Sequence, residues 1–422
     1  MPAARLPAPL DRAASALAPP RGASWLRAIV VATFCLMIAS FLFEMPPVFR
    51  YQWPSLAATL FLATTMLQPK TCFGRMPHAL LWFLGYLYVF VMSALLHGSV
   101  DVKEVARFLV FLIQAVLVFW AGFNLMSEQK TAEKALWWFV IACLVRAALP
   151  MVGVGRTTHE ERWTGGERVS AFGQDPNFSA VLLSAGLLTL IWLTHGASRS
   201  TLRPRFLVWP LVALLGMAIL GTGSRGGLAA LSAGLLAFTL TRASSLVSRL
   251  RYIAGTLLAV GVLAWGAMHT EIMRGRVEVT MEEGNMAGRE QMFPILVDMF
   301  LEKPVSGWGP MNNQYELAKR WPYGGRMVRA AHNLYLEVLT ESGMVGALPF
   351  LVGVALCLRA AWRARGSRYG ILPLALLAVF LTGGLTLDLV ANKPLWLVLG
   401  FALASDPRVP GAGEPDTVRG HA

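Results

Sequence analysis

Long apolar stretches separated by short polar segments make up most of the chain, and polar residues gather in only two longer segments. Twelve stretches are apolar enough to be helices that cross a membrane, each of which needs about 20 residues. They span residues 25–43, 53–67, 79–97, 108–126, 135–152, 177–195, 206–220, 226–241, 252–268, 343–358, 371–387 and 394–405. The pattern predicts an all-α polytopic membrane protein with about 12 transmembrane helices.

Composition agrees with this class. Of the 422 residues, 55% are hydrophobic and only 14% are charged, whereas a soluble domain carries roughly a quarter charged residues. The spans leave no room for an extensive soluble domain.

The first span follows a long charged leader without a cleavage pattern, so we expect it to be retained. The ends, 1–22 and 406–422, are rich in Ala, Pro, Arg and Gly and are expected to be disordered.

Lys and Arg set the expected orientation, because short cytoplasmic loops collect them. With the N-terminus inside, every inner loop holds at least two positive charges, and the even number of spans returns the C-terminus to the same side. Both termini are therefore predicted to be cytoplasmic, and segments 153–176 and 269–330 to face outward. The net charge of +13 partly reflects this bias. No basic and aromatic module for nucleic acid is visible.

The predicted organisation has three membrane-associated parts. Residues 23–268 hold the first nine spans and the short outer loop 153–176. Residues 269–342 form a large outer loop that ends in an interfacial helix, and 343–405 hold the last three spans. The four cysteines avoid the outer loops and lack metal-ligand spacing, so neither a structural disulfide nor a metal site is expected from them.

Both outer loops are rich in Arg, although Lys and Arg usually collect in cytoplasmic loops. Long loops can be translocated regardless of charge, or the arginines can bind an anionic ligand. Arg225 is the strongest candidate for binding an anion, since it lies within GTGSRGG at 221–227, between two apolar stretches. A glycine-rich helix start lets a phosphate approach, and a guanidinium can bind it through two hydrogen bonds. The alternative is a positive anchor that reaches the lipid headgroups.

Arg289 and His332 are the other candidates in the large loop. Arg289 begins a predicted short helix, followed by a tight turn with PVSGWG at 304–309. Such a helix can cap the structure or contact substrate. His332 begins a predicted amphipathic helix along the membrane surface, with Glu337 and Glu341 on its polar face, and Gly343 turns this helix into the tenth span. Near neutral pH an imidazole can take a proton from a hydroxyl nucleophile, although a single His is often structural.

Several sequence groups, taken together, resemble the O-antigen ligase and polymerase superfamily of bacterial inner-membrane glycosyltransferases. They are DPN at 175–177, GSRG at 223–226, Gly288-Arg289 with PVSGWG, and HNL at 332–334 with ESG at 341–343. Their order, spacing and common predicted side make the combination specific. The resemblance covers roughly residues 150–400, and Phe293 stands where the family often has a Trp after the Gly-Arg pair.

The resemblance implies a fold similar to that of GT-C glycosyltransferases and an inverting, metal-independent transfer from an undecaprenyl-diphosphate-linked glycan. It implies that Arg225 and Arg289 hold the donor diphosphate and that His332 is the base. An acidic residue in the last outer loop is implicated in ligases, and Asp388 fits that place, although it could instead pair with Lys393. The remaining supporting candidates are Asn333, Arg168 and Asn177.

The residues themselves also favour chemistry without a metal or other cofactor. Fixed Arg side chains can stabilise the charge that develops on a diphosphate leaving group. A divalent ion would require closely spaced carboxylates, and no Asp-x-Asp occurs in the chain. We therefore expect no metal and no cofactor.

The predicted activity is that of an O-antigen ligase in the bacterial inner membrane, with its site facing the periplasm. Its donor would be undecaprenyl-diphosphate-linked O-antigen and its acceptor lipid A–core oligosaccharide, both held among membrane lipids. One rival is an O-antigen polymerase, which often has two large outer loops, whereas one loop dominates here. A protein-directed oligosaccharyltransferase usually carries extra soluble sequence. A lipid-linked glycan transporter would predict internal repeats and charges in the middle of spans.

Overall fold

Helices dominate the residues that the computed structural model describes, namely 21–43, 53–160, 167–195, 208–241, 245–322 and 328–409. The apolar helices are α1 (Arg21–Ser40), α2 (Trp53–Thr65), α4 (His78–His97), α5 (Val102–Met126), α6 (Gln129–Ala148), α7 (Pro176–His195), α8 (Val208–Gly221), α9 (Arg225–Ala237), α10 (Leu246–Met268), α14 (Leu334–Ala364), α15 (Leu372–Gly383) and α16 (Lys393–Ala404). The predicted disordered tails lie mostly outside these residues, at 1–20 and 410–422.

Six helices are long and apolar enough to cross a membrane by length and composition. They are His78–His97, Val102–Met126, Gln129–Val152, Pro176–Thr194, Leu246–Met268 and Leu334–Ala364. Shorter apolar helices, including α8, α9, α15 and α16, accompany them. The chain is therefore an all-α, multi-pass membrane protein in its main architecture.

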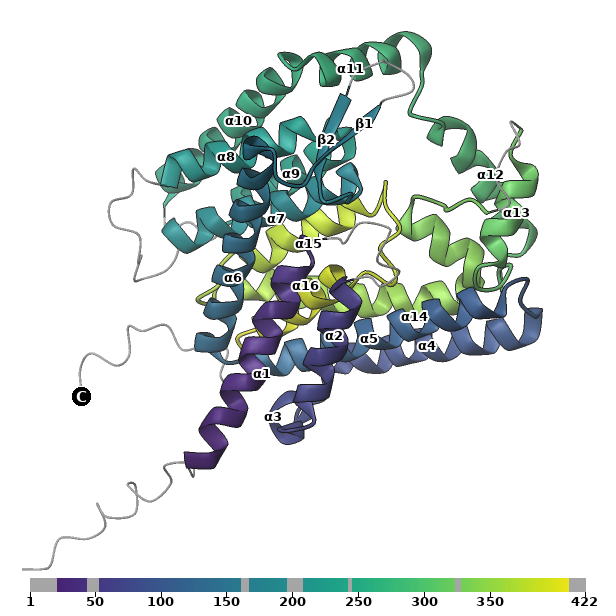
Figure 1. The fold of residues 1–422 in the computed structure, drawn as a ribbon, viewed down its shortest axis with the longest axis horizontal. Coiled ribbons are helices and arrows are strands. Elements are labelled where there is room, and N and C mark those ends of the chain that lie inside the picture. The colour runs from purple at the N-terminus through teal and green to yellow at the C-terminus, as the bar shows by residue number, and fades with distance from the viewer. Residues whose placement is uncertain are drawn as a thin grey trace, which may run out of the picture.

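The helices pack around α7. Of its most apolar window, 83% is buried, compared with 6% for α10, so α7 is central and α10 peripheral. Three helix pairs make the closest associations: α14 with α4, α15 with α9, and α16 with α5. Figure 1 shows α4, α5 and α14 lying side by side, and α12 and α13 at one end of the bundle.

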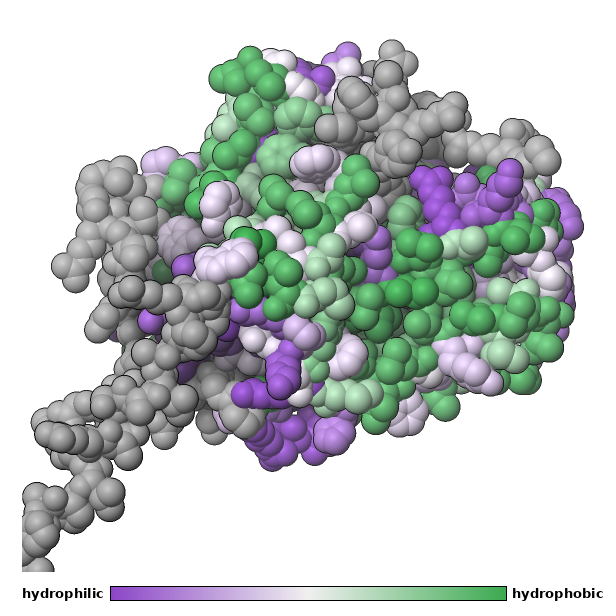
Figure 2. Space-filling view, turned by 60° about the horizontal axis from the view of Figure 1, so that its bottom comes forward, coloured by the Kyte–Doolittle hydropathy of each residue, from purple (hydrophilic) through white to green (hydrophobic). Residues whose placement is uncertain are grey.

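The outer surface of the bundle is apolar. Figure 2 shows a broad hydrophobic area with hydrophilic residues near its edges. Large side chains exposed on the helices include Leu81, Tyr88, Leu95, Leu258, Trp265 and Leu348. A contiguous apolar surface of this extent is unusual for a soluble protein, and hydrocarbon chains of a bilayer would cover it.

A small β-hairpin departs from the purely helical prediction. Strands β1 (Arg156–Glu160) and β2 (Glu167–Ala171) pair antiparallel within the predicted outer loop 153–176. Thr157, Thr158 and Val169 are β-branched residues that favour strands. The pattern is too short and too polar to stand out beside the long apolar helices, which is why the sequence reading missed it.

The segment 269–330 forms three short helices, α11 (Glu271–Glu283), α12 (Arg289–Glu302) and α13 (Asn312–Arg320). A small apolar core holds α12 and α13 together and includes Met292, Leu296 and Leu317. Arg320 donates hydrogen bonds to Glu302 at 2.6 and 2.7 Å. These bonds lower the pKa of the Glu302 carboxyl, because they favour its charged form.

Helix α14 is interrupted at Gly343, where the backbone is non-helical (φ 60°, ψ −164°). The 304–309 turn fills the break, because backbone N–H groups of Trp308 and Gly309 donate to the carbonyls of Thr340 and Glu341 at 2.8 and 2.9 Å. On the other side, Met344 N–H donates to Pro304 at 2.8 Å. The groups PVSGWG at 304–309 and ESG at 341–343 therefore meet in one joint, and this joint orients the first turns of α14.

We expect Gly343→Ala to destabilise the protein by about 2–4 kcal/mol, because the backbone there suits only glycine and the site is close-packed. A Cβ atom at Gly343 would lie 2.3 Å from the carbonyl oxygen of Val305. Thermal unfolding in detergent measures the effect. Gly255→Ala in α10 is the matched control, since open space surrounds that position. An unchanged melting temperature for Gly343→Ala would contradict the importance of the joint.

Candidate functional site

The loop 384–392, between α15 and α16, brings together candidate residues that are far apart in sequence. Asn333 caps α14 with its side-chain oxygen, which accepts from the N–H groups of Tyr335 and Leu336 at 3.0 and 3.1 Å. Its amide nitrogen donates to the carbonyl of Leu385 at 3.3 Å. Asn333 thereby ties the start of α14 to this loop, which fits a supporting role.

His332 lies immediately before this cap rather than inside the helix. The predicted helix began at His332, but α14 begins at Leu334 because Asn333 occupies the N-cap position. The backbone of His332 has φ 47°, a left-handed conformation that is uncommon outside glycine. This conformation separates the imidazole from the helix, and 55% of the side chain is exposed. A substrate hydroxyl can therefore reach the ring.

The imidazole of His332 contacts Asp388 of the same loop. Nδ1 of His332 lies 3.3 Å from Oδ2 of Asp388. With Nδ1 protonated and facing the carboxylate, Nε2 is the nitrogen that can accept a proton. Lys393, the other partner considered for Asp388, donates instead to Ser55 Oγ at 3.1 Å. The structure thus favours the pairing of Asp388 with His332.

Arg289 reaches the same loop from α12. Gly288 precedes it in a left-handed conformation, and Nη2 of Arg289 donates to the carbonyl of Thr386 at 3.3 Å. Thr386 also packs against Gly226, where a Cβ atom would lie 2.5 Å from the threonine Oγ1. Since Gly226 follows Arg225, the loop brings Arg289 close to the start of α9 on which Arg225 lies.

Arg225 is the first residue of α9, and its guanidinium is held by backbone oxygens. Its Nη1 donates to the carbonyl of Arg276 at 2.9 Å and lies 3.4 Å from that of Asn285. The side chain of Arg276 in turn donates to the carbonyl of Gly223 at 2.6 Å. Helix α11 and the GTGSRGG turn therefore fix each other, and they place a positive charge at a helix N-terminus, where anions bind favourably.

Arg168 and Asn177 bind this turn from β2 and from the start of α7. Arg168 donates to Asn177 Oδ1 and to the carbonyl of Thr222, both at 2.9 Å. Ser224 Oγ also donates to Asn177 Oδ1 at 2.9 Å. These contacts connect β2, the start of α7 and the GTGSRGG turn, so both residues stabilise the turn that carries Arg225.

The sequence reading did not identify two buried acids on α14. It placed Glu337 and Glu341 on a polar face of an interfacial helix, but each residue is only 2% exposed. Tyr86 Oη donates to Glu341 at 3.4 Å, and the carboxyl of Glu337 faces Asp388. The spacing of one turn from Asn333 indicates that Glu337 shares its side of the helix, but it does not indicate that a loop covers this side.

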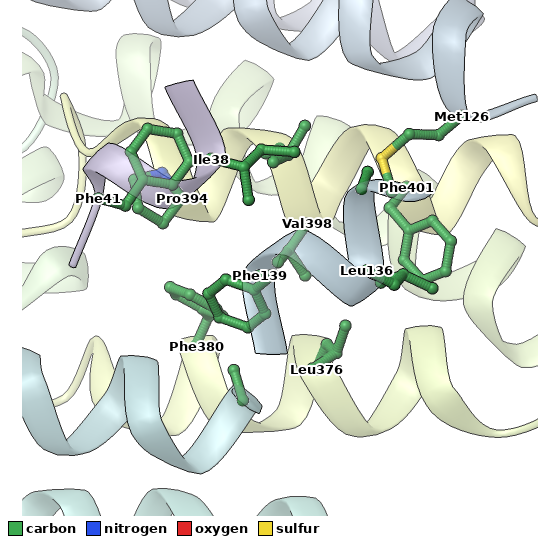
Figure 3. Close-up of a pocket in the computed structure, with 13 residues that line it drawn as sticks. Ile38, Phe41, Met126, Leu136, Phe139, Leu376, Phe380, Pro394, Val398 and Phe401 are labelled. Atoms are coloured by element: carbon green, nitrogen blue, oxygen red, sulfur yellow. The ribbon is translucent and has the colours of Figure 1, made fainter. Parts of the chain in front are cut away.

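An apolar cavity lies beside this region without belonging to it (Figure 3). Side chains of α1, α6, α15 and α16 line it, including Ile38, Phe139, Phe380 and Val398. Its lining offers no acid, base or charge for chemistry. Among the residues that the structure describes, no group of three or more His, Cys, Asp or Glu is arranged to hold a metal ion.

The geometry brings the half-exposed His332, Asp388 and Arg289 together at one loop of a membrane protein, with Arg225 nearby at the start of α9. The O-antigen ligase family model matches residues 210–351, which include Arg225, Arg289 and His332. The chain is also 26% identical over 300 residues to an O-antigen ligase of Pseudomonas aeruginosa, covering 69% of this chain and 67% of the relative. These matches confirm the resemblance to the O-antigen ligase superfamily over this part of the chain.

Proposed function

We propose that the protein is an O-antigen ligase that transfers a preassembled glycan from undecaprenyl diphosphate to lipid A–core oligosaccharide. In this proposal the chain has 12 transmembrane helices, a GT-C-like fold, both termini in the cytoplasm and its site at the periplasmic face of the inner membrane. The observation that carries the proposal is the convergence of His332, Asp388 and Arg289 on the loop 384–392.

The donor binds through its diphosphate. Arg225 and Arg289 offer guanidinium groups whose planar donors match phosphate oxygens. The glycan projects outward, and the isoprenoid tail lies among the apolar helices. Phe380 and Pro394, which flank the loop 384–392, both line the apolar cavity of Figure 3, so apolar surface for the tail lies next to the site.

The transfer then proceeds by direct displacement. A hydroxyl group of the lipid A–core acceptor gives its proton to Nε2 of His332 and attacks the anomeric carbon of the donor sugar. The bond from that carbon to the diphosphate oxygen breaks, and the configuration inverts. Undecaprenyl diphosphate leaves with an added negative charge, which the two arginines stabilise, while Asp388 stabilises the imidazolium that forms.

A complementation experiment tests this proposal. The chain is expressed in a bacterial strain that assembles undecaprenyl-diphosphate-linked O-antigen but lacks a ligase, and lipopolysaccharide is analysed by gel electrophoresis. We expect glycan on lipid A–core. Longer glycans on the undecaprenyl carrier, with lipid A–core unmodified, would contradict the ligase assignment and indicate a polymerase. Faster movement of unmodified donor across the membrane, without transfer, would indicate a transporter.

A further inference from the structure

Glu337 and Asp388 form a pair of carboxyl groups behind the candidate base. Glu337 is one helical turn after the Asn333 cap, on the side of α14 that contacts the loop 384–392, and its carboxyl faces that of Asp388. Oε2 of Glu337 and Oδ1 of Asp388 are both buried, and neither accepts a hydrogen bond from a donor among the described residues. The opposite oxygen of Asp388 contacts His332.

Two facing carboxylates repel each other, so this arrangement is stable only when one of them carries a proton. Burial disfavours the charged form, and Glu337 is 2% exposed whereas the Asp388 side chain is 24% exposed. The buried Glu341, one turn further along α14, adds to the repulsion felt by a charged Glu337. Asp388, by contrast, has Nδ1 of His332 beside its Oδ2 at 3.3 Å.

Tyr86 is a further ionisable group near these acids, and it does not change which carboxyl carries the proton. Tyr86 of α4 donates its hydroxyl hydrogen to Glu341 and not to Glu337. The proton between Glu337 and Asp388 therefore belongs to Glu337, and its hydrogen bond points toward the carboxylate that contacts His332.

We propose that Glu337 is a positioning residue: it is a neutral carboxylic acid that donates a hydrogen bond to Asp388 and so keeps the Asp388 carboxylate against Nδ1 of His332. The expected effect on the rate of glycan transfer rests on the proposed function, whereas the protonation state of Glu337 does not. With Asp388 fixed on both sides, the imidazole is held in the tautomer whose Nε2 accepts the acceptor's proton.

Infrared spectroscopy of the purified protein tests the protonation state without any transfer reaction. A protonated carboxyl group gives a C=O stretch that is separate from the carboxylate bands. We expect Glu337→Gln to remove such a band at neutral pH and Asp388→Asn, which changes its hydrogen-bond acceptor, to shift it. A spectrum of Glu337→Gln that matches the wild type in this region would overturn the proposal.

Kinetics of glycan transfer test the positioning role. We expect Glu337→Leu, which has no donor, to lower kcat by about 10- to 100-fold, part of the effect of a general base, with KM for the donor little changed. Glu337→Gln keeps an N–H donor and should recover most of that loss. Glu283→Gln, at an exposed carboxyl in the last turn of α11, is the control and should stay near wild-type kcat.

Two kinetic outcomes would overturn the proposal. One is a wild-type kcat for Glu337→Leu, and the other is a Glu337→Gln variant as slow as Glu337→Leu when both melt at the wild-type temperature. If the wild-type protein transfers no glycan to lipid A–core, the proposed function fails, and the infrared result alone still decides the state of Glu337.

Discussion

Replacing His332 by Ala should lower the rate of glycan transfer by about 10²- to 10⁴-fold, the usual contribution of a general base. Donor binding should persist, because the arginines remain. The imidazole is half exposed and contacts Asp388 through Nδ1, so its loss removes the group that accepts the proton from the acceptor hydroxyl. Transfer by purified protein, measured under single-turnover conditions, gives the rate.

A second variant separates chemistry from backbone strain at this position. His332 has a left-handed backbone, which Asn tolerates better than Ala. His332→Asn should therefore fold as well as the wild type and still be inactive. The matched control is His269→Ala, since His269 is exposed at the end of α10 and should not affect transfer. Wild-type activity in His332→Asn would show that the position serves the backbone and not proton transfer.

Replacing Arg225 or Arg289 by Ala should lower kcat/KM by about 100- to 1000-fold each, the range found when a group that stabilises developing charge is removed. Lys should restore only part of the loss, because an ammonium cannot form the two parallel hydrogen bonds of a guanidinium. The measurement is transfer rate against donor concentration in detergent or liposomes.

The control for these arginines lies in the same segment. Arg274 of α11 is 61% exposed and pairs with Glu278 of its own helix at 3.4 Å, so Arg274→Ala should change kcat/KM by less than about twofold, as exposed pairs contribute little. Equal losses for Arg274→Ala and Arg289→Ala would mean that the segment attracts the donor by general charge. That result would contradict a defined diphosphate site.

The main architecture was predictable because the hydrophobic pattern is strong. A helix that faces lipid or a buried core must be apolar over its whole length, so ranges such as 79–97 and 177–195 correspond closely to α4 and α7. The short strands β1 and β2 carry no such signal, since they pair with each other and β2 packs beside α7 and α8. Helix α14 begins two residues later than predicted, because Asn333 is the N-cap and therefore lies outside the helix.

The sequence could predict which single residues are candidates, but not which of them lie close together in the fold. Arg225, Arg289 and His332 stand out from their motifs, yet nothing local indicates that Thr386 lies between two of these segments. The choice between His332 and Lys393 as partner of Asp388 also depended on tertiary structure. Glu337 was assigned to a polar surface because helical periodicity alone cannot show that a loop 50 residues later covers that face.

Reconstitution of the purified protein tests the central claim most directly. The protein is mixed with an undecaprenyl-diphosphate glycan and lipid A–core in the presence of EDTA, beside His332→Ala, and the products are identified by mass spectrometry. We predict glycan on lipid A–core with the wild-type protein and none with His332→Ala. Transfer that stops on addition of EDTA, or that proceeds equally well without His332, would contradict a site built on one histidine base and two arginines.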